Sequence, residues 1–155
     1  MAVKKIEEFL ETHKINYEKI IHSQVFTATE KAAAANVSGK ELAKTVMVKI
    51  DGKMIMAVLQ ACYKVDFDLL KTATGANEVE LANEEEFKYL FPECEIGAIP
   101  PFGNIYGFEV LVEENLTKYE EISFNAGSHT ELFRLSYKDF EKHIKPKVVR
   151  FSTEY

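Results

Sequence analysis

The segment TVMVKIDGKMIMAVLQA, residues 45–61, decides the fold expected for this chain. Two apolar, β-prone runs, Thr45–Ile50 and Met54–Ala61, are separated by Asp51-Gly52, a dipeptide that favours a two-residue hairpin turn. Both runs are apolar at nearly every position, which is typical of strands whose two faces are covered. The sequence therefore predicts a β-hairpin at the centre of a sheet.

Shorter patterns on either side of the hairpin predict the other elements. The expected helices are Val3–Lys14, an alanine-rich helix after the capping box Thr27-Ala28-Thr29-Glu30, Phe67–Thr74 between Asp66 and Gly75, a helix from the capping box at Asn83 to about Leu90, and a helix to Ile144 capped at Ser136. The expected strands are Tyr17–Ile21, Tyr106–Val112, Glu121–Phe124, Glu131–Leu135 and Val148–Phe151. This succession predicts one α+β domain over residues 1–155, with a mixed, mostly antiparallel central sheet and helices packed around it.

Composition excludes several classes of protein. The apolar runs fall far short of the ~20 residues of a membrane helix, and the start of the chain lacks the apolar stretch of a signal peptide. Two cysteines, Cys62 and Cys94, form no CxxC pair; free thiols in a cytoplasmic protein are the favoured interpretation, and a disulfide stays open. The four histidines have no zinc-binding spacing, so we expect no metal and no cofactor. The nucleophile elbow, the P-loop and the dinucleotide fingerprint are all missing.

The candidate site is centred on GAIPPFG, residues 97–103. Two prolines fix φ, and the glycines allow positive φ and close approach of the backbone to a ligand. A second glycine-centred segment, Asn125-Ala126-Gly127-Ser128-His129, follows about thirty residues later. These features are typical of a site made largely of backbone, although a rigid entry into a strand would use the same residues.

Individual polar residues allow two interpretations each. Lys44, at the start of the first strand, is either a lysine whose ammonium stays in water or a contact to a phosphate or carboxylate. His129 is either a solvated turn residue or a side chain that faces a pocket. Glu113 and Glu114 point to opposite sides of a strand, and a solvated pair is the default expectation.

Three motifs in this order resemble one known family. The segments AKTVMVK (43–49), GAIPPFG (97–103) and FNAGSH (124–129) are similar to those of the YbaK and prolyl-tRNA-synthetase-associated editing domains, which are aminoacyl-tRNA deacylases. The similarity runs from about His22 to Leu135, and its strongest match is the GxxxP loop, here Gly97 to Pro101.

The resemblance implies a role for each matched residue. Lys44 would bind the terminal phosphates of the tRNA, and Gly97 and Pro101 would belong to the loop that holds the aminoacyl ester, with His129 at a nearby pocket position. No catalytic side chain is needed, because fixed amides stabilise an oxyanion and the substrate's ribose hydroxyl and a water take part. The remaining candidates for substrate binding are Ala98, Ile99, Pro100, Phe102, Gly127, Ser128, Met47 and Phe26.

We therefore expect a free-standing enzyme that deacylates mischarged tRNA, a monomer acting on the acceptor end, with or without a synthetase. The net charge of −6 opposes strong binding of a polyanion, but lysines gather near Lys40–Lys53 and in the tail from Lys142 to Arg150. Two alternatives remain: a non-catalytic module that binds tRNA or a synthetase, and a protein that binds a small molecule.

Overall fold

The computed structural model describes residues 4–22 and 40–154. Its helices are α1 (Lys4–Thr12), α3 (Phe67–Thr74), α4 (Glu84–Phe87) and α5 (Tyr137–Ile144), with 3₁₀ turns η1 (Lys88–Leu90), η2 (Gly103–Tyr106) and η3 (Glu114–Lys118). Its strands are β1 (Tyr17–Ile21), β2 (Leu42–Ile50), β3 (Lys53–Gln60), β4 (Tyr63–Val65), β5 (Val79–Leu81), β6 (Val110–Glu113), β7 (Glu121–Asn125), β8 (Glu131–Ser136), β9 (Lys147–Val149) and β10 (Ser152–Glu154). Within these residues, no helix is long and apolar enough to cross a membrane.

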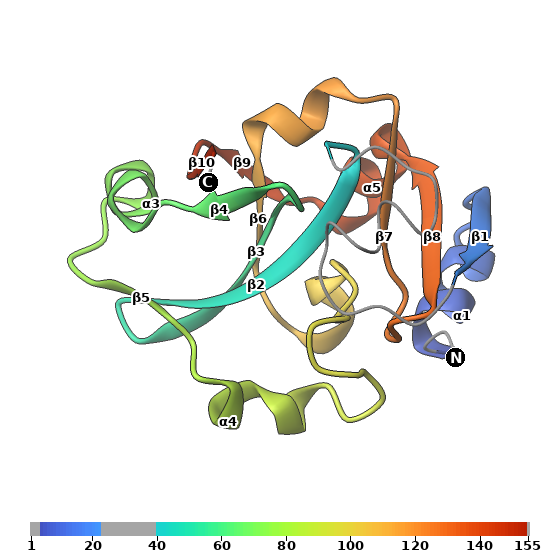
Figure 1. The fold of residues 1–155 in the computed structure, drawn as a ribbon, viewed down its shortest axis with the longest axis horizontal. Coiled ribbons are helices and arrows are strands. Elements are labelled where there is room, and N and C mark those ends of the chain that lie inside the picture. The colour runs from blue at the N-terminus through green and yellow to red at the C-terminus, as the bar shows by residue number, and fades with distance from the viewer. Residues whose placement is uncertain (1–3, 23–39, 155) are drawn as a thin grey trace.

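One mixed sheet forms the centre of the molecule (Figure 1). Its strands follow the order β1-β8-β7-β2-β3-β6-β9, and β5 pairs with the end of β2, while β10 and β4 form a separate two-stranded sheet. Pairing is parallel between β2 and β7, β3 and β6, and β6 and β9, and antiparallel elsewhere. The predicted α+β class with a mixed, mostly antiparallel sheet is confirmed.

The β2–β3 hairpin occupies the middle of the sheet, as the apolar runs predicted. Asp51 and Gly52 both adopt positive φ, at 50° and 82°, which is the geometry of a tight hairpin turn. The Asp51 carboxylate also accepts from the backbone amides of Asn77 and Glu78, at 3.0 and 2.8 Å. The turn residue that shapes the hairpin therefore also fixes the segment leading into β5.

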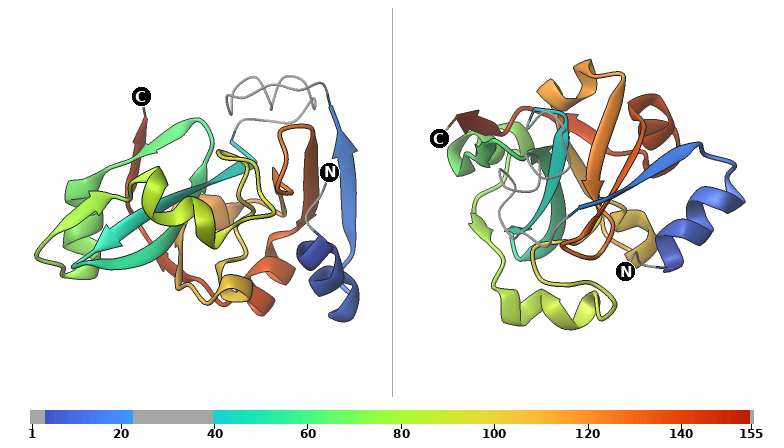
Figure 2. Two further views of the ribbon diagram at one scale, coloured as in Figure 1. Left: turned by 90° about the horizontal axis from the view of Figure 1, so that it is seen from below. Right: turned by 45° about the vertical axis from the view of Figure 1, so that its right-hand side comes forward.

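The hairpin builds two cores because its side chains alternate between the faces of the sheet. Met56 and Val58 contribute to the larger core, with apolar residues of α1 and α5. Ala57 and Leu59 contribute to a second core with Leu70 of α3. Figure 2 shows α1 and α5 on the same side of the β1–β8–β7 part of the sheet.

Two predicted strands are wrong in extent. The segment predicted as Tyr106–Val112 begins with η2 and a left-handed Gly107 (φ 81°), so β6 starts only at Val110. Only the first half of the predicted strand Val148–Phe151 is a strand, as part of β9, and β10 begins after it. The strand ends early because the Phe151 amide donates to the Glu113 carboxylate (3.0 Å) and not to a neighbouring strand. The short strands β4 and β5 were not predicted.

Glu113 corrects the expectation of a solvated pair. Its side chain is fully buried, and Oε1 accepts from the Phe151 amide, the Ser152 amide and the Ser152 hydroxyl at 2.8–3.0 Å. Oε2 accepts from the Asn115 amide at 3.0 Å, while Glu114 is exposed. Glu113 therefore holds the C-terminal segment against β6.

The helix boundaries follow the capping signals in most places. Asp66 caps α3, which ends at a left-handed Gly75, and the capping box at Asn83 is present. The helix that begins there ends at Phe87 and continues as the 3₁₀ turn η1. Ser136 occupies the N-cap of α5 without a side-chain hydrogen bond, and the helix expected after Thr27 lies outside the described residues.

Candidate functional site

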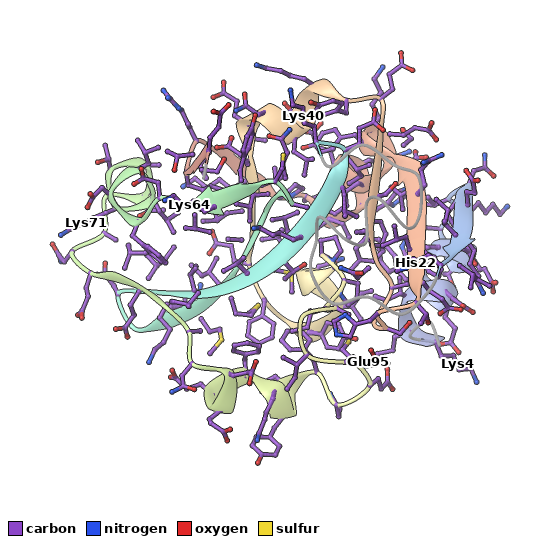
Figure 3. All side chains as sticks on the ribbon, viewed as in Figure 1. Lys4, His22, Lys40, Lys64, Lys71 and Glu95 are labelled. Atoms are coloured by element: carbon purple, nitrogen blue, oxygen red, sulfur yellow. The ribbon has the colours of Figure 1, made fainter. Side chains whose placement is uncertain are left out.

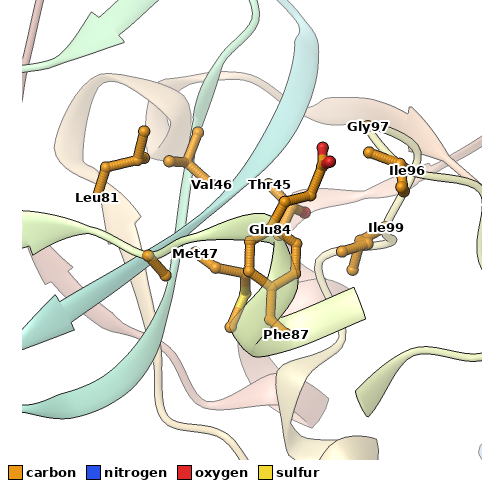
Figure 4. A pocket seen from close by; sticks show the side chains of 10 residues that line it. Thr45, Val46, Met47, Leu81, Glu84, Phe87, Ile96, Gly97 and Ile99 are labelled. Carbon is orange, nitrogen blue, oxygen red and sulfur yellow. The ribbon is translucent and has the colours of Figure 1, made fainter. Parts of the chain in front are cut away.

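A cavity of about 290 Å³ opens beside the loop that contains Gly97 (Figure 4). Two walls enclose it. The β2–loop wall consists of Thr45, Val46, Met47, Ile96, Gly97 and Ile99, and the β5–α4 wall consists of Leu81, Ala82, Glu84 and Phe87. This volume lies at the lower end of the ~300–1,000 Å³ typical of small-molecule sites.

The cavity exists because one edge of β2 is only partly paired. On that edge, β7 pairs with Leu42 and Ala43, and β5 pairs with residues from Val48 onward. The residues between these two pairings, Thr45 to Met47, line the cavity. The Ala82 amide donates to the Met47 carbonyl at 3.0 Å, so the β5–α4 wall begins where this gap ends.

The two glycines of GAIPPFG are required for different reasons. Gly97 has φ +84°, a conformation that side chains rarely adopt. Gly103 is a close-packing position, because a Cβ there would lie 2.7 Å from Val110 Cγ2 and 3.2 Å from Met56 Sδ. The loop is thus shaped at its first glycine and anchored in the core at its second.

Few backbone amides of the loop remain available to a ligand. The Ala98 amide donates to the Glu95 carbonyl at 3.0 Å, and Pro100 and Pro101 have no N–H. Within residues 4–22 and 40–154, no protein carbonyl accepts from the Ile99 amide. Ile99 also lines the cavity, so its amide is a candidate donor to a bound carbonyl.

The second glycine segment lies directly against the loop, as the sequence suggested. The Gly127 amide donates to the Ala98 carbonyl at 3.0 Å, and the Glu95 amide donates to the Gly127 carbonyl at 2.8 Å. Gly127 has φ 97°, and Ser128 next to it is buried with its hydroxyl 3.2 Å from Thr130 Oγ1. The two segments therefore form one hydrogen-bonded unit.

The His129 side chain helps to hold this hydrogen-bonded unit in place. Its side chain is 4% exposed, so the interpretation as a solvated turn residue is wrong. Nε2 lies 2.6 Å from the Ile96 carbonyl and must donate there, because a carbonyl only accepts. The His129 backbone amide donates to Glu95 Oε2 at 3.0 Å, and a Cβ on Gly97 would lie 3.4 Å from His129 Cε1. His129 is not among the cavity-lining residues; it fixes Ile96 and Gly97, which are.

Lys44 lies beside the cavity and does not line it. Strand alternation places its side chain on the same face as that of Val46, which is two residues or roughly 7 Å further along β2 and does line the cavity. Two other lysines of the expected basic cluster are bound to carboxylates: Lys49 to Glu86 (2.7 Å) and Lys53 to Glu109 (3.5 Å). These two lysines of the cluster therefore have acidic partners.

The other predicted residues divide between the cavity and the core. Met47, Gly97 and Ile99 line the cavity. Phe102 is 1% exposed and packs among Phe9, Phe124 and Phe140, and Ala98, Pro100 and Pro101 are also buried outside the lining. Phe26 lies outside the described residues.

Sequence reasoning missed the whole β5–α4 wall. Glu84 and Phe87 are three residues apart on α4, so they share one side of the helix, and this spacing was the available signal. Lys49 of β2 connects to this wall through Glu86 (2.7 Å) and Glu80 (3.7 Å). The hydrogen bond to Glu86 raises the pKa of Lys49 and lowers that of Glu86.

The described residues offer neither an activated thiol near the loop nor a metal centre. Burial raises the pKa of the Cys94 thiol to about 11, so this thiol stays protonated at neutral pH, and both cysteines are free. No group of three or more His, Cys, Asp or Glu side chains within residues 4–22 and 40–154 could hold a metal ion.

Solved structures share this fold almost throughout. The crystal structure of the hypothetical protein APE2540 matches 97% of this chain and 100% of its own, with a TM-score of 0.86 and 22% sequence identity. The structure of a proposed trans-editing enzyme for prolyl tRNA synthetase matches 97% of this chain and 96% of its own, with a TM-score of 0.82 and 20% identity. These likenesses define the class: an α+β domain of the fold seen in that proposed editing protein.

Sequence comparison identifies the family. The model of the aminoacyl-tRNA editing domain matches residues 22–143, and this chain belongs to that family. It is also 28% identical over 96 residues to the proline--tRNA ligase of Bacillus mycoides (strain KBAB4). That match covers 62% of this chain but only 17% of the ligase.

Proposed function

We propose that this chain hydrolyses the ester bond of mischarged aminoacyl-tRNA, acting in trans on the acceptor end and releasing free amino acid and tRNA. The observation that carries the proposal is the small apolar cavity bordered by the Gly97 loop. Its volume suits one small aminoacyl group, and a cavity of this size rejects larger side chains sterically.

The proposed reaction consumes one water molecule and uses no metal or cofactor. Water attacks the ester carbonyl, the carbonyl oxygen becomes an oxyanion, and the bond to the ribose oxygen breaks as that oxygen takes up a proton. In this proposal the Ile99 amide stabilises the oxyanion, which is supported by Ile99 lining the cavity, and losing one such donor typically costs about 10²–10³ in rate. His129 and Gly127 hold the loop, so the amide is oriented before the substrate arrives.

Lys44 is the proposed contact to the terminal phosphates of the tRNA. Its place beside the cavity suits this role, because the phosphates lie outside while the aminoacyl group enters. A charge-assisted hydrogen bond of this kind is worth ~1.5–3 kcal/mol, or about 10- to 100-fold in kcat/KM. We expect Lys44→Ala to lower deacylation by that factor and to leave the fold intact.

The test is a panel of tRNAs charged with alanine, serine, cysteine and larger amino acids. Release of free amino acid is measured for the wild-type protein, Lys44→Ala and the control Lys64→Ala, whose exposed side chain on β4 lies far from the loop that carries Glu95 (Figure 3). Equal rates for the two variants would remove the role of Lys44. Binding of tRNA with no hydrolysis of any panel member would favour a non-catalytic module.

A further inference from the structure

Glu84 is the one charged side chain among the ten described residues that line the cavity. The other nine are apolar residues, a glycine and Thr45. Figure 4 shows the Glu84 carboxylate directed toward Ile96 and Gly97, across the cavity from the wall to which it belongs. A negative charge therefore faces the loop from the opposite side.

Within the described part of the chain, the neighbouring glutamates form ion pairs with lysines, and no such pair is found for Glu84. Glu80 and Glu86 bind Lys49, and Glu85 binds Lys88 at 3.0 Å. Among the residues that the structure describes, no cation lies within ion-pair distance of the Glu84 carboxylate. The Glu84 carboxylate is exposed to solvent, so it is accessible to a cationic group of a ligand that enters the cavity.

Initiation and capping of α4 do not explain why residue 84 is a glutamate. Negative side chains favour the first turn of a helix, but Glu85 and Glu86 already supply them there. The Asn83 side chain caps the helix, and Glu86 completes the capping box. Helix initiation therefore does not require a carboxylate at position 84.

The chemistry of an aminoacyl ester fits this arrangement. The carbon next to the ester carbonyl carries both the side chain and an amino group, and the amino group is a cation when protonated. With the carbonyl at the loop and the side chain in the apolar interior of Met47, Phe87 and Ile99, the remaining substituent is the ammonium group. A carboxylate facing the loop is the natural partner for it.

We propose that Glu84 binds the α-ammonium group of the aminoacyl ester and so restricts the site to substrates with a free amino group. This inference rests on the proposed deacylase function and adds a determinant of specificity to it. An N-acylated aminoacyl-tRNA has lost the cation, so it cannot form the charge-assisted hydrogen bond with Glu84 and is a poorer substrate.

The experiment compares alanyl-tRNA with N-acetyl-alanyl-tRNA on the wild-type protein, Glu84→Gln and the matched control Glu85→Gln. We expect the wild-type protein to prefer the free amine by about 10- to 100-fold in kcat/KM. Glu84→Gln should lose this preference by slowing on alanyl-tRNA alone, and Glu85→Gln should keep it. An unchanged preference in Glu84→Gln overturns the role of Glu84, whereas a wild-type protein that hydrolyses neither ester overturns the proposed function.

A binding measurement distinguishes failure of the proposed role of Glu84 from failure of the proposed deacylase function. L-Alaninamide carries the ammonium group without a hydrolysable ester, and N-acetyl-L-alaninamide lacks the charge. Titration followed by NMR of the Thr45 and Ile99 amides should show the cationic probe binding at least tenfold more tightly to the wild-type protein than to Glu84→Gln. Equal binding of L-alaninamide by the two proteins contradicts the proposal whether or not the chain is a deacylase.

Discussion

The two walls of the cavity differ in how deeply their residues are buried and in what holds them in place. In the β2–loop wall, Met47 and Ile99 are at most 9% exposed, and His129 and Gly127 tie the loop down from within the core. In the β5–α4 wall, no residue of α4 is buried, and Leu81 is 61% exposed. The β2–loop wall is therefore anchored mainly in the core, although Ile96 is 51% exposed. The β5–α4 wall is attached by the pairing of β5 with β2, the buried Ala82 and the surface ion pairs of Lys49.

We expect the two walls to affect different kinetic constants. Chemistry on a carbonyl needs donors that do not move, because preorganised amides stabilise an oxyanion without reorganisation. A wall that recognises the amino group and the side chain can be less firmly attached, because it acts mainly on substrate affinity. We therefore expect changes behind the β2–loop wall to reduce kcat and changes in the β5–α4 wall to raise KM.

The largest loss of stability should come from His129→Ala. The change removes a buried ring and leaves the Ile96 carbonyl without its donor, at a cost of ~2–3 kcal/mol in the free energy of unfolding. We expect kcat to fall by about tenfold or more, because the loop loses its support. Urea unfolding and steady-state deacylation measure the two effects.

The matched control is His13→Ala, because the exposed His13 ring also bonds a carbonyl, that of Phe9. Its loss should cost about 1 kcal/mol or less and leave kcat unchanged. A His129 variant that is as stable and as active as the His13 variant would show that the loop is fixed by other contacts.

A smaller effect is expected from Lys49→Met, which breaks the connection between β2 and α4. We expect KM to rise about twofold and kcat to stay unchanged, because partly exposed ion pairs are weak. Lys53→Met, which breaks the pair with Glu109, should leave both constants unchanged. A drop in kcat for Lys49→Met would contradict the division between the walls.

The same ion pair predicts a dependence on pH. Lys49 lowers the pKa of Glu86 below its ordinary 4.5, so the stabilisation is present above that value and is lost as the pH falls through the folded-state pKa. The wild-type protein should therefore unfold at a higher temperature than Lys49→Met at pH 6, and the difference should vanish in acid. A difference that stays constant down to pH 3 would exclude the pair as its source.

The sequence predicted what local patterns determine. The Asp51-Gly52 turn, the central place of β2 and β3, and the capping of α3 and α4 each follow from neighbouring residues. The glycines and prolines of GAIPPFG led to the loop at Gly97, and the substrate-binding candidates Met47 and Ile99 line the cavity with it.

The features that the sequence did not predict depend on contacts between residues that are far apart in the chain. The β5–α4 wall is set by pairing of β5 with β2 and by Lys49 reaching Glu86, thirty-seven positions along the chain. Glu113 was expected in solvent because its partners, Phe151 and Ser152, are brought to it only by the complete fold. His129 was ambiguous for the same reason, since its acceptor is the carbonyl of Ile96.

A pair of glycine variants tests whether the backbone geometry at Gly97 supports catalysis. Gly97 (φ +84°) and Gly75 (φ +68°) are both left-handed, so alanine at either should cost ~1–2 kcal/mol of stability. Only Gly97 lines the cavity and lies against His129, whereas a Cβ on Gly75 would meet nothing within 4 Å. We predict that Gly97→Ala lowers kcat/KM for small aminoacyl-tRNA about 100-fold while Gly75→Ala keeps the wild-type rate. Equal rates in the two variants would show that the backbone geometry at Gly97 does not support catalysis.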